Sequence, residues 1–169
     1  MSDRSKKIFV ILSVGVPFLL YCAYYYGMMI KNAPYKFSEF DSIVFEYGPG
    51  DSLINKYNSK TGDYQYMSRG NKLIKKHLKL SKDQLHYLHH KAADLGFWNF
   101  PANEVNDSLK NSPVKPPRYL IEFNYKRKSK KVMFEEAYDG DPKLKDANER
   151  LIKEIEKVID EADQQQNGN

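Results

Sequence analysis

Three histidines lie within five positions of the segment DQLHYLHHKAADLGFW, which covers residues 83–98. His86 and His90 are four residues apart, so a helix would place their imidazoles one turn apart, as in many zinc-ligand pairs. On a helical wheel, however, both lie opposite the apolar residues and face solvent. A convex helix face brings no ligands from a second element, and the metalloprotease motif would need a glutamate where Tyr87 stands. We therefore interpret this side as a solvated face, predict no metal, and keep a zinc site at His86 and His90 as the alternative.

Glu104 and Asp107 form a second candidate group, on the segment that follows Trp98, Phe100 and Pro101. Two carboxylates can act as general acid and general base when their surroundings separate their pKa values. Such residues more commonly form turns or solvated loops. The sequence thus favours a domain without catalytic residues or cofactors, with a small hydrolase using Glu104 and Asp107 as the alternative.

The sharpest charge cluster is the segment KRKSKK at 126–131. Its cations are Lys126, Arg127, Lys128, Lys130 and Lys131. At a hairpin tip such charges are commonly solvated and discourage pairing at the sheet edge. They also suit contact with anionic lipid head groups or an acidic polymer.

Composition limits the classes of function. The 169 residues carry 27 basic and 22 acidic side chains, and this mild, mixed charge argues against a dedicated nucleic-acid binder. The chain has one cysteine, Cys22, which excludes an intramolecular disulfide and a cysteine-type zinc site. Aromatic residues make up 14% of the chain, which favours a packed core over disorder.

The most apolar segment runs from Ile8 to Ile30 without a charged residue. As a helix it would span roughly 34 Å, enough to cross a bilayer core. A basic flank, residues 1–7, precedes it and holds more positive charge than the segment that follows. The positive-inside rule then predicts a single-pass anchor at 8–30, with the amino terminus cytoplasmic and the body outside.

Two processed forms remain as alternatives to this anchor. A cleaved signal peptide needs small residues at its cleavage site. A bacterial lipoprotein would carry its lipid on Cys22, normally after Gly, Ala or Ser. The residue before Cys22 is Tyr21, which fits neither form well.

The rest of the chain predicts a linker at 31–40, an α+β domain at 41–163 and a frayed tail at 164–169. Apolar and polar residues alternate in six segments, as expected of strands. These segments are SIVFEY, SLINKYN, YQYMSR, KLIKKHLKL, RYLIEFNYK and KVMFEEAY. In the fourth, Lys76 shares a face with apolar residues, so we expect it at a sheet edge or with its ammonium group reaching solvent.

Two helices are predicted from their end signals. Ser81 with Gln84 forms a capping box, and Gly96 follows the last turn, which gives a helix over 82–95. The second helix begins with Asp141 as N-cap and Pro142 at the first position. Its apolar stripe is Leu144, Ala147, Leu151, Ile155, Val158 and Ala162. After the first helix, we expect Trp98 to close the open end of the core, so that Trp98→Ala would cost roughly 3–5 kcal/mol.

The predicted order is β-β-β-β-α-β-β-α, an antiparallel sheet with two helices packed on one face, preceded by the transmembrane helix. The segments FEYGPG, LSKDQLHYL, LGFWNF and YDGDPKL resemble those of a group of small bacterial envelope domains. The resemblance covers about residues 42–162 and implies a location and a fold, without catalytic residues. The sequence thus predicts an anchored extracytoplasmic binding or scaffolding domain, whose partner is an envelope protein, an anionic lipid or a polymer.

Overall fold

The computed structural model describes residues 3–31, 35–106 and 115–167. The chain divides into two compact units, Met1–Tyr35 and Lys36–Asn169. The second unit, called the folded unit below, therefore starts a few residues before the predicted boundary at 41. Its mixture of helices and one sheet confirms the α+β class.

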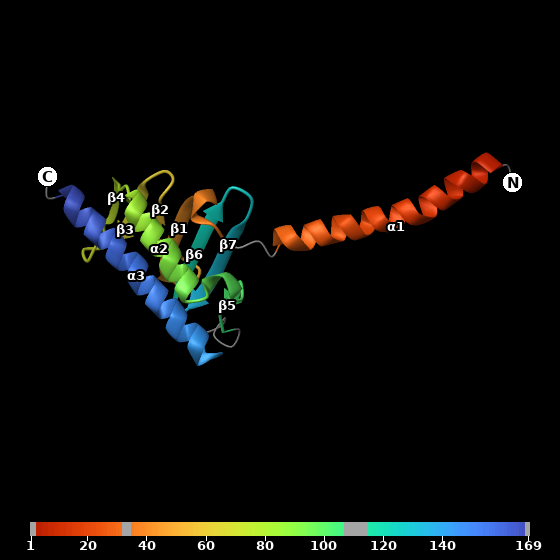
Figure 1. The fold of residues 1–169 in the computed structure, drawn as a ribbon. Coiled ribbons are helices and arrows are strands. Elements are labelled where there is room, and N and C mark those ends of the chain that lie inside the picture. The colour runs from red at the N-terminus through yellow and green to blue at the C-terminus, as the bar shows by residue number, and fades with distance from the viewer. Residues whose placement is uncertain (1–2, 32–34, 107–114, 168–169) are drawn as a thin grey trace. The chain divides into compact units, whose positions relative to one another are not determined.

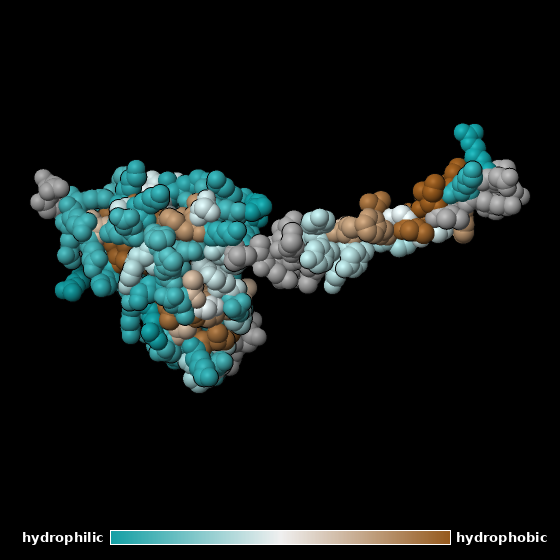
Figure 2. Space-filling model, in the orientation of Figure 1, coloured by the Kyte–Doolittle hydropathy of each residue, from teal (hydrophilic) through white to brown (hydrophobic). Residues whose placement is uncertain are grey.

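Helix α1 (Asp3–Lys31) forms the first unit. Within it, Lys7–Tyr26 is long and apolar enough to cross a membrane, although a signal sequence has the same properties. Its large apolar side chains stay exposed, as Phe18 at 63% and Leu19 at 66% illustrate. Brown and pale residues accordingly line α1 in Figure 2, whereas the visible face of the folded unit is mainly hydrophilic.

The sheet of the folded unit has seven strands in the order β4-β3-β2-β1-β6-β7-β5. The strands are β1 (Phe40–Pro49), β2 (Asn55–Asn58), β3 (Asp63–Met67), β4 (Leu73–His77), β5 (Asn103–Glu104), β6 (Pro117–Tyr125) and β7 (Ser129–Glu135). In the described part of this unit there are also two 3-10 turns, η1 (Phe37–Glu39) and η2 (Phe97–Asn99), and two helices. The long pair β1–β6 forms its centre, with Phe45 opposite Ile121.

The prediction of a purely antiparallel sheet was wrong at one edge. Strand β5 pairs in parallel with β7, with Glu104 opposite Phe134, and the sheet is therefore mixed. The backbone N–H of Met133 also donates to the carbonyl oxygen of Ala102 at 3.0 Å. Two residues held by a distant strand leave no alternating pattern in their own sequence, so the segment was predicted as a loop.

Helices α2 (Lys82–Asp94) and α3 (Pro142–Asn167) lie on the same face of the sheet in Figure 1. The core between them and the sheet consists mainly of aliphatic and phenylalanine side chains. Its fully buried members include Ile43, Phe45, Leu88, Ala92, Ile121, Phe123, Val132, Phe134, Leu151 and Ile155. The alternation in the strands and the apolar stripe in α3 thus predicted the core-facing sides correctly.

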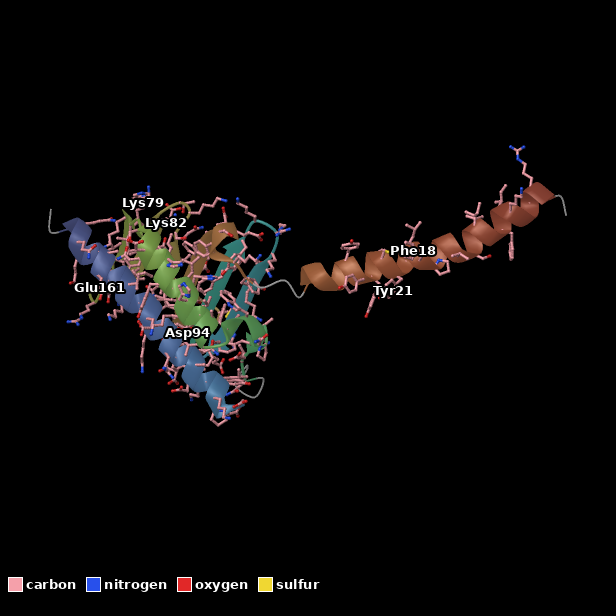
Figure 3. The ribbon with its side chains drawn as sticks, viewed as in Figure 1. Phe18, Tyr21, Lys79, Lys82, Asp94 and Glu161 are labelled. Atoms are coloured by element: carbon pink, nitrogen blue, oxygen red, sulfur yellow. The ribbon has the colours of Figure 1, made fainter. Side chains whose placement is uncertain are left out.

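The end signals of both helices are confirmed. The Ser81 hydroxyl accepts from the backbone N–H of Gln84, and the Gln84 side chain accepts from the backbone N–H of Ser81. Gly96 has φ +76°, the left-handed conformation that ends α2. The Asp141 carboxylate accepts from the backbone N–H of Lys143 at 2.8 Å, as an N-cap of α3 should. Figure 3 labels Lys82 and Asp94 at the two ends of α2.

The predicted frayed tail at 164–169 is corrected in part, because α3 continues to Asn167. Glutamine is a good helix former, and the side-chain amide of Gln166 donates to the carbonyl oxygen of Lys79 at 2.9 Å. This contact fastens the last turn of α3 to the segment that leads into α2.

The aromatic group after α2 closes the core mainly through Phe97 and Phe100, and the predicted residue, Trp98, packs at its margin. Phe97 is fully buried and Phe100 nearly so, whereas Trp98 is only half-buried, with its ring centroid 5.3 Å from that of Phe123. Truncating a fully buried ring leaves a closed cavity, whereas solvent can enter the space left by a half-buried one.

We expect Phe97→Ala to lower the free energy of unfolding by about 3–5 kcal/mol, and Trp98→Ala by about 2 kcal/mol or less. Denaturant unfolding followed by circular dichroism would measure both, since this signal does not depend on the tryptophan. A larger loss for Trp98→Ala than for Phe97→Ala would contradict this assignment.

Candidate functional site: an aromatic and acidic cavity

The two solvent-facing histidines come together on α2. The Nε2 atoms of His86 and His90 lie 3.0 Å apart, so that one ring donates a hydrogen bond to the other, and the ring of Phe37 packs against His86 with centroids 4.6 Å apart. Among the described residues, no group of three or more His, Cys, Asp or Glu side chains could hold a metal ion. A zinc site at His86 and His90 stays an alternative with two nitrogen ligands.

The third histidine serves the core instead. His89 is buried, and its Nδ1 atom lies 2.8 Å from the hydroxyl of Tyr125. Burial lowers the pKa of His89, and the neighbouring His90 and His86 lower it further. His89 is therefore a neutral partner of Tyr125 under ordinary conditions.

Of the two candidate catalytic carboxylates, Glu104 lies on β5 and Asp107 lies outside the described residues. Glu104 is completely buried, and the Asn148 side-chain amide donates to its Oε2 atom at 2.6 Å. Among the residues described, Glu104 Oε1 and Asn148 Oδ1 are buried acceptors without a donor. Burial raises the pKa of Glu104 to about 7, although Asn148 and Lys130 act in the opposite direction. That pKa suits acid–base chemistry, but complete burial withholds the carboxyl from a substrate.

The basic hairpin is less uniform than its sequence predicted. Arg127 forms an ion pair with Glu39, and Lys130 turns inward so that its ammonium group donates to the carbonyl oxygen of Phe100. Lys130 lies opposite Phe123 in the register and is partly buried, which lowers its pKa. Contact with an anionic surface stays a prediction, and these two residues are already engaged within the fold.

A cavity of about 110 Å³ lies between α3 and strands β1–β3. It is lined by Phe45, Tyr47, Lys56, Tyr57, Tyr64, Glu156, Ile159 and Asp160. Four of these are aromatic and two are carboxylates one helical turn apart. We call this group the aromatic–acidic cavity.

Register and helix geometry explain how distant residues assemble here. Phe45 lies opposite Tyr57 and Tyr57 opposite Tyr64, so three adjacent strands place aromatic rings on the helix-covered face. Phe45 and Tyr57 are buried and form the floor, whereas Tyr47 and Tyr64 are half-buried walls. The opposite wall is α3, which presents carboxylates four residues apart.

The carboxylates of Glu156 and Asp160 concentrate negative charge at the cavity. Burial raises the pKa of Glu156, and the charge of Asp160 raises it further. Burial also raises the pKa of Tyr47 and of Tyr64, with added contributions from Glu156 and Asp160 at Tyr47 and from Asp160 at Tyr64. The positive charge of Lys56 is offset by the carboxylate of Glu46, which lies 3.3 Å from the Lys56 ammonium group.

A lysine of the chain itself lies beside the cavity, between a carboxylate of α3 and two tyrosine rings of β3. The ammonium of Lys76 lies 2.5 Å from the Asp163 carboxylate of α3, and 5.3 Å and 5.0 Å from the ring centroids of Tyr64 and Tyr66. β4 is the edge strand, so the predicted edge position of Lys76 is confirmed.

The aromatic–acidic cavity was not predicted from the sequence. Two local signals bear on it: the alternating tyrosines of YQY at 64–66, and the acidic residues Glu156, Asp160 and Asp163 at helical spacing. Neither signal predicts that the tyrosines and the acidic residues lie close together, because this depends on tertiary packing.

Neither a family model nor a curated protein matches the chain. The resemblance to bacterial envelope domains therefore stays a prediction.

Proposed function

We propose that this chain is a single-pass membrane protein whose extracytoplasmic folded unit binds a ligand or partner without catalysis. The observation that carries the proposal is the separation of the chain into an exposed apolar helix and a unit with its own buried core. An exposed helix with this much apolar surface is costly in water, and a bilayer removes that cost. In Figure 3, Phe18 and Tyr21 extend outward from α1, as lipid-facing side chains would.

The orientation follows from charge. Arg4, Lys6 and Lys7 precede the span, and positive residues are retained on the cytoplasmic side. The folded unit would then face the periplasm or the exterior. There, the aromatic–acidic cavity offers aromatic rings and carboxylates that could recognise a ligand.

The alternative is a small envelope hydrolase that uses Glu104 and Asp107. The pKa of Glu104, about 7, favours this hypothesis, since a general acid or base works best when its pKa lies near the ambient pH. Its burial favours a structural role.

Alkaline extraction of membranes, combined with carboxy-terminal reporter fusions, tests the proposal in a bacterial host. We expect the full-length chain to stay in the membrane pellet and only an extracytoplasmic reporter to be active. The variant Cys22→Ser should behave identically, because the helix itself is the anchor. A shortened chain in the soluble fraction would mean a cleaved signal, and a shortened chain in the pellet that Cys22→Ser leaves at full length would mean a lipoprotein. An active cytoplasmic reporter would overturn the orientation.

A further inference from the structure

Helix α3 already holds one ammonium group against tyrosine rings. Lys76 supplies it, Asp163 provides the carboxylate, and the rings of Tyr64 and Tyr66 lie at cation–π distances. This arrangement shows that the geometry of the surface, with rings on the sheet and acids on the helix, suits an alkylammonium cation.

The aromatic–acidic cavity repeats this chemistry one turn earlier on α3. Its acids are Glu156 and Asp160, and it shares Tyr64 with the Lys76 site. Among the described residues, neither acid forms an ion pair with a lysine or arginine. Like charges at this spacing repel, and the partial burial of Glu156 adds a desolvation cost. A cation between them would offset both costs.

We propose that the aromatic–acidic cavity binds one organic ammonium group of a small molecule. The volume of about 110 Å³ admits a single head group of this kind. Aromatic faces attract a weakly hydrated alkylated cation, whereas a divalent metal ion needs several oxygen ligands, which these rings do not supply. This inference rests on the proposed binding function and adds the chemical class of the ligand.

The test is titration of the full-length chain with tetramethylammonium chloride, in maltoside micelles that contain no choline head groups. Chloride and ionic strength are held constant with sodium chloride. We expect saturable binding by calorimetry and a rise in melting temperature. Choline should bind as well, whereas its neutral isostere 3,3-dimethylbutan-1-ol should bind about tenfold more weakly or worse, because only the charge differs.

Two pairs of substitutions separate the site from general charge effects. Glu156→Gln with Asp160→Asn removes the two cavity charges at nearly constant volume, and should weaken tetramethylammonium binding by about tenfold or more. The same variant should melt at a higher temperature than the wild type without ligand, since the repulsion is gone, and this shows that it is folded. The control pair, Asp146→Asn with Glu161→Gln, removes two exposed charges of α3 and should bind like the wild type; Glu161 is labelled in Figure 3.

Unchanged affinity in the cavity variant, equal binding of the neutral isostere, or no saturable binding would each overturn the inference. The outcome is distinguishable from that of the extraction experiment. If the chain resists extraction but does not bind tetramethylammonium, the proposed anchor is supported and the proposed ligand class is rejected. If the chain binds the cation but is extracted, the proposed site is supported and the anchor is rejected.

Discussion

Replacing Arg118 by methionine is expected to lower the free energy of unfolding of the folded unit by about 3–5 kcal/mol. Arg118 and Glu135 lie opposite each other on β6 and β7, and the Arg118 Nε–H donates to Glu135 Oε2 at 2.9 Å. Glu135 is completely buried, so losing the guanidinium would leave a charge without a counterion in a place that water does not reach. Within the described ranges, the other hydrogen bond to this carboxylate comes from the backbone N–H of Asn106, at 3.4 Å from Oε1.

The matched experiment is the double variant Arg118→Met with Glu135→Met, which removes both charges together. It should recover most of the lost stability, because apolar residues of similar size often replace a buried ion pair without loss. As a control, Lys56→Met breaks the exposed pair with Glu46 and should cost less than about 1 kcal/mol. Urea titration followed by fluorescence of Trp98, the only tryptophan, would measure all three. A loss below about 1 kcal/mol for Arg118→Met would contradict the role assigned to this pair.

The sequence predicted the features that neighbouring residues determine, namely the helix ends and the buried sides of strands. Ser81 and Gln84 define the start of α2 within four residues, and Gly96 ends it because a left-handed backbone is easiest for glycine. The alternation around Ile43 and Phe45 likewise showed which side of β1 is buried. None of these inferences needed to know which strand is next to which.

What could not be predicted depends on contacts across the fold. Tyr64 and Asp160 are 96 residues apart in the sequence, and without the sheet register the acids of α3 resemble any solvated helix face. Glu104 was predicted on a loop for the same reason, since its burial comes from β7 and from Asn148 of α3. Lys130 had looked like part of a free basic tip, and only its position opposite Phe123 turns it inward.

The pairing of Glu104 with Asn148 predicts how the stability of the folded unit depends on pH. The folded-state pKa of Glu104, about 7, lies above its ordinary value of 4.5, so the folded state holds the proton more tightly than the unfolded state. The contribution of this group is therefore most favourable below about pH 4.5 and is lost as the pH rises through about 7. The loss amounts to about 3 kcal/mol once the carboxyl is fully ionised.

Replacing Glu104 by glutamine should remove this dependence. A protonated carboxyl or a glutamine amide can donate to Asn148 Oδ1 while its oxygen accepts from Asn148 Nδ2. This pairs the two buried atoms, Glu104 Oε1 and Asn148 Oδ1, that have no partner among the described residues. The variant Glu104→Gln should thus match the wild type near pH 5 and exceed it by about 3 kcal/mol near pH 9. Urea titrations at both pH values measure the difference. Subtracting the unfolding free energy of the wild type from that of the variant at each pH cancels the contribution of Glu156, whose pKa is also raised. Glu161→Gln, at an exposed site of α3, is the control and should track the wild type at both values. A difference between Glu104→Gln and wild type that is the same at pH 5 and pH 9 would show that Glu104 keeps one charge state throughout, and the carboxyl–amide pairing would then be wrong.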